Sequence, residues 1–347
     1  MRSGLERFAI SMLWAMLAAA SPAVHAEEPE EQRKAALLKE CGEGFESRET
    51  AHWLIVHKAD PKWVDEAAKM LERTHDLFFE QFRKAGFDPQ PPGQKLVCVL
   101  IGTQDDFAKY KDAGRKPTGS PPPAEQPGPA SGQAARPLGL GSYSERTNRI
   151  ELCDIHSIPR DPRRPVDAAR TDLENVARIA HEAAHQLSFN TGVLNQRIGY
   201  PTWLGEGLAG NFEFSDANKP FGPLTDNLSP RATRLKQLYA DGKALPIKRI
   251  VTMSPLEVRQ AANKGLTYAE GWGLFRFLFT ERPKPFKQYL AALGDRPRGQ
   301  RTNADLALAA FEAAFGSADE LEKDWQQFLK RLGTAGLAPP APPPAGP

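Results

Sequence analysis

The stretch NVARIAHEAAHQLSFNTG, Asn175 to Gly192, contains two histidines four positions apart, with a glutamate directly after the first. Apolar residues at helical spacing predict an amphipathic helix that ends near Gly192. This stripe comprises Leu173, Val176, Ala177, Ala180, Ala184 and Leu187. Residues four apart share one face of a helix, so His181 and His185 can both reach one metal ion. Zinc suits them, because it accepts imidazole nitrogen and takes three protein ligands at a catalytic site. A pair of surface histidines around a helix-forming glutamate is the alternative for this motif alone.

Two glutamates are candidates to complete such a site. Glu182 is rotated by about 100° from His181, so its carboxylate lies close to the metal and can act as a general base. Glu206 stands in PTWLGEGLAGNFEF, after a connection that contains glycines, asparagines and a proline. Burial of Trp203 and Leu204 against the first helix would turn Glu206 inward as a third ligand. An exposed or salt-bridged glutamate is the alternative.

HEAAH followed by WLGEGLA resembles the gluzincin zinc metallopeptidases, and the WLxEG form looks most like their aminopeptidase branch. With GSYSERTNRIELCD and YAEGWGLFRFL added, the chain also resembles the bacterial "domain of unknown function 1570" group, a set of predicted exported gluzincins, from roughly Ala51 to Leu332. The resemblance implies one Zn²⁺ per chain. It implies a ligand set of His181, His185 and Glu206, with Glu182 as the general base.

Two further residues, Tyr268 and Glu213, are candidates for roles at the site, whereas two features of the related peptidases are missing. Tyr268 is similar in position to a tyrosine that donates a hydrogen bond to the developing oxyanion; a core tyrosine is the alternative. Glu213 is expected two helical turns after Glu206, where it would orient a liganding histidine or form a surface salt bridge. An acidic residue that supports a histidine in thermolysin-like gluzincins is replaced by Gly210. The amine-anchoring motif of the aminopeptidase branch is missing, so exopeptidase activity does not follow.

The order of predicted elements indicates an α+β fold. Strands are expected at His52 to Lys58 and Lys95 to Gly102, and a hairpin over Leu138 to Asp154 turns at residues 145–148. Between the first two strands, Asp60 followed by proline predicts the start of an amphipathic helix. After residue 165 the pattern becomes helical. We therefore expect a small N-terminal mixed β-sheet subdomain with helices, then a mainly helical subdomain, with the zinc cleft between them in a zincin-like arrangement.

The ends of the chain and one internal segment differ in composition from the rest. Residues 1–26 read as a secretory signal peptide cut near Ala26, with an uncleaved anchor as the alternative. A polar segment follows over 27–50, in which Glu28 to Glu40 are expected to be helical or frayed. The metallopeptidase domain is expected over 51–332, interrupted at 113–137 by a disordered proline-rich loop, and 333–347 form a proline-rich tail. Three cysteines, Cys41, Cys98 and Cys153, are too few for a disulfide framework and allow one bridge or buried thiols.

These observations favour an exported zinc metallopeptidase that hydrolyses peptide bonds in a peptide or protein substrate. The edge LGLGSYS, Leu138 to Ser144, is the candidate for pairing with an extended substrate. A non-catalytic zinc-containing module of the cell envelope that binds peptide or protein is the main alternative, and a zinc hydrolase of a non-peptide amide is a third. A formal net charge of +2 gives no basis for binding nucleic acid or a membrane surface. Cys153 with His156 in CDIH offers only two ligands and is interpreted as a loop after a strand.

Overall fold

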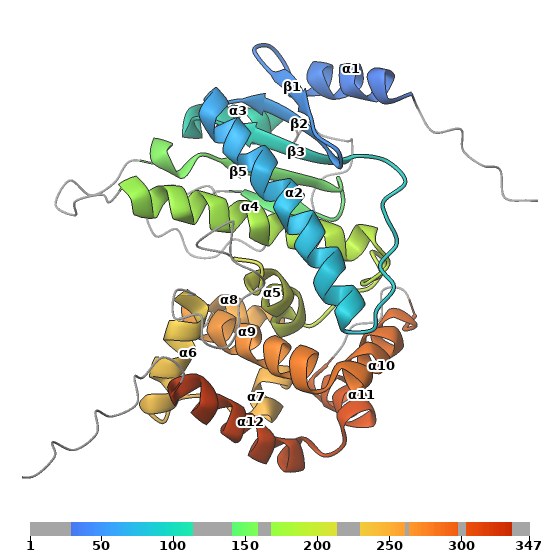
Figure 1. Cartoon of the computed structure of the whole chain (residues 1–347), viewed down its shortest axis with the longest axis vertical. Helices are drawn as coiled ribbons and strands as arrows, with labels where there is room; N and C mark the ends of the chain where they lie inside the picture. The colour runs from blue at the N-terminus through green and yellow to red at the C-terminus, as the bar shows by residue number, and fades with distance from the viewer. Residues whose placement is uncertain are drawn as a thin grey trace, which may run out of the picture.

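The protein, described from a computed structural model, has an α+β fold (Figure 1). A mixed sheet and a helical half meet along one long helix, α4 (Ala168–Asn190). The structure describes residues 29–113, 141–158, 168–213, 230–260, 264–297 and 303–334. The predicted signal peptide, nearly all of the proline-rich loop and nearly all of the tail lie outside these residues. No helix among the described residues is long and apolar enough to cross a membrane.

Five strands form the sheet in the spatial order β1-β2-β3-β5-β4. They are β1 (Glu46–Glu49), β2 (Trp53–Lys58), β3 (Leu96–Ile101), β4 (Gly141–Ser144) and β5 (Arg149–Cys153). The inner pairs β2–β3 and β3–β5 are parallel, whereas β1 and β4 are antiparallel edge strands. The expected strands and hairpin are confirmed. The polar segment before residue 51 adds β1, a strand that the sequence pattern does not indicate.

Different helices cover the two faces of the sheet (Figure 1). They are α1 (Glu30–Cys41) and α3 (Gln104–Ala113) on one face, and α2 (Pro61–Lys84) and α4 (Ala168–Asn190) on the other. Side chains alternate along a strand, so Trp53 and Ile55 join the core with α2 and α4, while Leu54 and Val56 join the core with α1 and α3. Burial on both faces explains why all of β3 and the first four residues of β2 are continuous apolar runs.

Helix α2 begins as the sequence predicts. The Asp60 carboxylate accepts hydrogen bonds from the backbone N–H groups of Lys62 and Trp63, with Pro61 at the first helical position. The apolar residues that recur at helical spacing along α2 are buried, and they pack α2 against the sheet and α4. They are Val64, Ala67, Leu71, Phe78 and Phe82. Aspartate at this position satisfies N–H groups that have no partner within the helix.

Gln186 fixes how α4 is turned about its own axis. Its side chain is fully buried, and its Oε1 accepts from Trp53 Nε1 at 2.9 Å. Its Nε2 donates to the carbonyl oxygens of Val97 at 3.0 Å and Asn148 at 2.9 Å. These three bonds tie α4 to the sheet, which leaves its histidine-bearing side to face the helical half.

The apolar stripe predicted for α4 is wrong at its first residue, because Leu173 is 44% exposed.

The helical half is built on a close contact between two helices, α5 and α9 (Figure 1). Its members are α5 (Thr202–Gly210), α6 (Pro230–Ala240), α7 (Ile247–Thr252), α8 (Pro255–Gln260), α9 (Lys264–Glu281), α10 (Pro283–Gly294), α11 (Ala304–Phe315) and α12 (Ala318–Thr334). A Cβ atom placed on Gly207 would lie 2.3 Å from the carbonyl oxygen of Gly271. Because that neighbour is backbone, glycine at 207 sets the spacing of α5 and α9, and with it the position of Glu206.

Candidate metal centre

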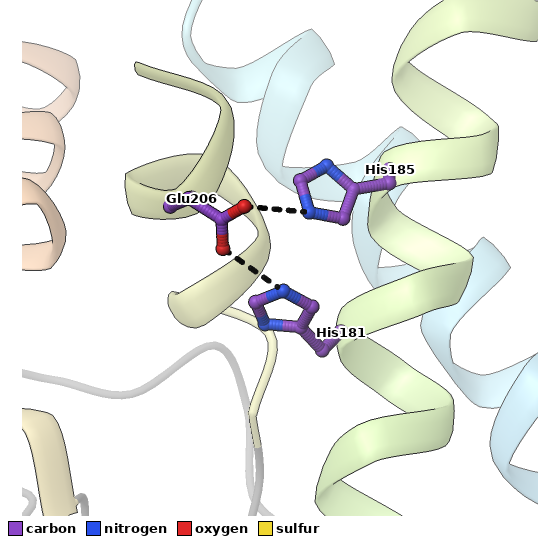
Figure 2. Close-up of side chains that lie close together, drawn as sticks. All are labelled: His181, His185 and Glu206. Carbon is purple, nitrogen blue, oxygen red and sulfur yellow. Dashed lines mark ion pairs between the residues drawn. The ribbon is translucent and has the colours of Figure 1, made fainter. Parts of the chain in front are cut away.

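Two histidines of α4 and a glutamate of α5 come together where the sheet half meets the helical half (Figure 2). His181 Nε2 lies 3.4 Å from Glu206 Oε2, and His185 Nε2 lies 3.9 Å from Glu206 Oε1. One possible ligand atom from each residue lies within 4.8 Å of the others, a spacing that can hold one metal ion. The structure thus brings together the three residues that the sequence selects.

Apolar packing turns Glu206 toward α4. Leu204 and Leu208 of the same helix are fully buried, and Trp203 is only 4% exposed. The Trp203 ring stacks on Tyr289 of α10, with centroids 6.1 Å apart, so this anchor lies within the helical half. Glu206, at 27% side-chain exposure, remains on the side that faces the histidines. Trp203 and Leu204 are buried as expected, but the Trp203 ring stacks on α10 and not, as expected, on the first helix, α4.

Glu213 and Arg231 support the first histidine. His181 Nδ1 lies 2.9 Å from Glu213 Oε1, which directs the other ring nitrogen toward Glu206. Arg231 donates to both Glu213 oxygens, from Nε at 3.0 Å and from Nη2 at 2.8 Å. The expected place of Glu213 on the helix is wrong, since α5 ends at Gly210. The Asn211 side chain there donates to the Gly207 carbonyl at 2.7 Å and ends the helix.

The charges of the site favour a cation. Burial lowers the pKa of His181, but the contacts with Glu206 and Glu213 outweigh it and raise that pKa to about 10. In His185, burial and then the charge of His181 lower the pKa. Burial opposes ionisation of both glutamates, but the hydrogen bond from His181 helps to lower the pKa of each, that of Glu213 to about 2. The carboxylates are therefore ionised beside the ring nitrogens.

This donor set fits Zn²⁺. Two imidazole nitrogens and one carboxylate oxygen are ligands that zinc accepts, and three protein ligands leave a coordination position open. The hydrogen bond from Nδ1 of His181 to Glu213 also fits, because in the neutral ring that a metal ion requires it keeps the proton on Nδ1 and leaves the lone pair on Nε2. His156 lies elsewhere and its Nε2 is 2.7 Å from Asp172. CDIH follows a strand, as expected, but it is not an irregular loop: Cys153 ends β5, and His156 lies in a short 3-10 helix, η1 (Ile155–Ser157).

Glu182 connects the site to the edge of the sheet. Its Oε2 accepts a hydrogen bond of 2.6 Å from the backbone N–H of Tyr143, in edge strand β4. The carboxylate is thus held between α4 and the part of the predicted substrate-pairing edge that the structure describes. This bond leaves Oε1 of Glu182 as the oxygen available for a further contact.

Tyr268 of α9 belongs to the same region. Tyr268 and Glu206 line one pocket, and burial followed by the charge of Glu206 raises the pKa of Tyr268. Arg231 lies over the Tyr268 ring, with its Cζ 5.2 Å from the centroid. Arg231 therefore contacts both Tyr268 and Glu213. No motif in the sequence marks Arg231, because it stands at the start of an ordinary helix pattern, in α6.

A family model matches this part of the chain. It is described as "Protein of unknown function (DUF1570)" and covers residues 175–298, from within α4 to just beyond α10. The span includes the three grouped side chains, Glu182 and Tyr268, and it supports the resemblance to the domain of unknown function 1570 group. Among curated proteins, none matches the chain.

Proposed function

We propose that the protein is an exported zinc metallopeptidase with a gluzincin-type site in a zincin-like fold. The observation that carries this proposal is the convergence of His181, His185 and Glu206, with Glu182 between the two histidines on α4. The predicted signal peptide at residues 1–26 supports export. The substrate is a peptide or protein, and it is cleaved between edge strand β4 and the helical half.

The residues around the site have distinct roles in this proposal. Zinc, when bound, polarises a peptide carbonyl and makes water a better nucleophile at neutral pH. Glu182 accepts the proton of the attacking water and passes it to the leaving amine. Tyr268 donates a hydrogen bond from its hydroxyl to the oxygen on which negative charge develops. Backbone groups of β4 pair with the extended substrate.

One observation favours a second function, that of a non-catalytic zinc-containing module that binds peptide or protein. The 2.6 Å bond from the Tyr143 N–H occupies one oxygen of Glu182, so this carboxylate also serves to hold β4 against α4. A residue with that structural role would be kept without any catalysis. The edge strand would then bind a partner and release it uncleaved.

The substitution Glu182→Gln separates the two functions. Glutamine keeps an oxygen that accepts from Tyr143 but cannot take a proton, so zinc binding should persist while cleavage of a peptide library falls by orders of magnitude. Glu174→Gln, the same change at an exposed position of α4, is the matched control and should leave cleavage unchanged. Equal cleavage by wild type and Glu182→Gln would contradict the assigned base. A zinc-loaded wild type that cleaves no library member would favour the binding module.

A further inference from the structure

Tyr143 presents its backbone N–H at the free edge of the sheet. It lies in β4, which pairs antiparallel with β5 on one side only. Residues of an antiparallel strand face their partner strand and the opposite side in turn, each with its N–H and C=O together. Because the Tyr143 N–H donates to Glu182 Oε2 at 2.6 Å, it does not serve the pairing with β5. The C=O of Tyr143 and both groups of Gly141, two positions earlier, therefore also point to the free edge.

Glu182 and a peptide paired with β4 require the same donor. An extended peptide that adds to a sheet edge is held by main-chain hydrogen bonds to that edge. A peptide paired with Tyr143 runs past the turn of α4 that carries His181, Glu182 and His185. One backbone N–H offers one proton. The carboxylate of Glu182 and a carbonyl of the peptide therefore compete for it.

From this competition we propose that the Tyr143 N–H is a substrate-binding donor that Glu182 occupies until an extended peptide displaces it. The inference rests on the proposed function, which takes β4 as the strand that pairs with the substrate. A backbone carbonyl of the peptide takes the N–H, and Oε2 of Glu182 is released. The main chain of the substrate thus frees the base. Extended segments of several residues displace Glu182, whereas an amide too short to reach β4 leaves it held.

Other contacts keep β4 in place when this bond is exchanged. The Tyr143 ring stacks on Phe189 of α4, with centroids 5.9 Å apart. Asn148, in the turn between β4 and β5, exchanges two hydrogen bonds of 2.8 Å with Asn190 of α4. Since neither contact involves Glu182, its carboxylate can leave the Tyr143 N–H without releasing the strand. The displacement replaces one hydrogen bond of that N–H by another.

Peptide affinity in two Glu182 variants tests the competition. The variants are Glu182→Gln, whose side-chain oxygen can still accept from Tyr143, and Glu182→Ala, which leaves no acceptor. Both are loaded with zinc, and both lack the base, so the peptide stays intact. The probe is an acetylated, amidated hexapeptide selected from a library for binding to the Glu182→Gln protein. Calorimetry should show that Glu182→Ala binds it about 2- to 10-fold tighter, the range for one neutral hydrogen bond.

Two substitutions of Tyr143 show whether its N–H is the source of that gain. Tyr143→Pro removes the N–H, and proline is tolerated on an edge strand where the N–H makes no bond to a neighbouring strand. Tyr143→Ala removes the same ring but keeps the N–H, so it is the matched control. The gain of Glu182→Ala over Glu182→Gln should persist with Tyr143→Ala and disappear with Tyr143→Pro. Equal affinities throughout, or a gain that survives Tyr143→Pro, overturn the proposal.

Hydrogen exchange gives a second measurement that needs no proline. In Glu182→Ala protein with isotope-labelled tyrosine nitrogen, the Tyr143 amide should exchange rapidly, and bound hexapeptide should slow it by about 10-fold or more. The Tyr143 signal is identified by its loss in Tyr143→Phe. An exchange rate that the bound peptide leaves unchanged overturns the proposal, even where Tyr143→Pro does not fold.

These results separate the inference from the function on which it rests. Cleavage by the wild type without competition at Tyr143 sustains the peptidase and rejects the displacement. Competition without any cleavage by the wild type keeps the displacement, as a step in peptide binding, and rejects the peptidase. A library in which no hexapeptide binds rejects both the displacement and the pairing with β4.

Discussion

His181 and Glu213 are joined by a 2.9 Å hydrogen bond between Nδ1 and Oε1, and Arg231 holds the same carboxylate from its other side. The pairing fixes one ring of the candidate metal centre before any ion arrives. Glu213 lies beyond the end of α5, in a part of the chain that no helix holds in place. Its contacts with His181 and Arg231 therefore hold it in position.

The three grouped residues are expected to bind one zinc ion per chain. Alanine at His181, His185 or Glu206 removes one of three protein ligands, so zinc affinity should fall sharply in each variant. His156→Ala, which changes a histidine outside the group, should retain full affinity. Metal analysis of purified protein with competition by a chelator measures this. Full occupancy in the Glu206 variant would remove that residue from the ligand set.

Glu213→Gln is expected to weaken zinc binding by about 10- to 100-fold, the usual effect of losing a carboxylate that orients a liganding histidine. Glutamine keeps the size of the side chain but loses the charge that pairs with Arg231. The control is Glu281→Gln, which breaks an ion pair with Arg331 at the far end of α9. Chelator competition on both variants gives the comparison, and equal affinities would leave Glu213 with a structural role only.

Tyr268→Phe removes a hydroxyl from the pocket that Glu206 also lines. If this hydroxyl stabilises the oxyanion, kcat should drop by about 100-fold with KM little changed. Tyr289→Phe is a matched control, because its buried hydroxyl has no hydrogen-bond partner among the described residues. Steady-state kinetics on a cleaved peptide separate the two. A fall in the thermal midpoint of Tyr268→Phe without a selective fall in kcat would show a core residue.

Gly207→Ala should destabilise the protein by about 3 kcal/mol, because the new methyl group meets the backbone of Gly271 and forces α5 away from α9. Zinc affinity should fall as well, since Glu206 moves with α5. Gly210→Ala introduces the same methyl group at 3.5 Å from Trp272, an ordinary contact, and should be neutral or slightly stabilising. Denaturant unfolding of both variants tests this pair. Similar stabilities would mean that α5 and α9 can separate freely.

The pKa of Glu270, raised to about 7 by burial, predicts a pH dependence of folding. Its ordinary value is 4.5, so between these two pH values the folded state binds more protons than the unfolded state. Stability should therefore fall as pH rises through that window and stay lower above it. Glu270→Gln removes this contribution, which amounts to about 3 kcal/mol at pH 8 for a shift of this size. Unfolding of both proteins at pH 4 and pH 8 should show a gain for the variant at pH 8 only.

Much of the fold can be predicted from sequence because local chemistry and burial agree there. All of β3 and the first four residues of β2 are apolar and lie in the middle of the sheet. Asp60 with Pro61 marks a helix start that the structure reproduces. In α4, four-residue spacing alone places His181 and His185 on one side.

The remaining features depend on contacts between distant parts of the chain. Strand β1 has the sequence ESRE, whose polar pattern reflects an exposed edge and not a core strand. Gln186 resembles any polar helix residue until its three partners on the sheet are known. Glu213 follows α5 and Arg231 lies in α6, so the two come into contact only when the chain folds. Spacing along the sequence carries no signal for such pairs.

The ion pair between Glu213 and Arg231 also closes a segment of the chain, because the two residues stand 18 positions apart. These two residues lie on either side of residues 214–229, and their contact holds both ends of that stretch at fixed separation. Doubling the length of a chain segment closed in this way costs only about 0.6 kcal/mol of entropy. The support of His181 therefore depends on the contact between Glu213 and Arg231 more than on the length of the chain that joins them.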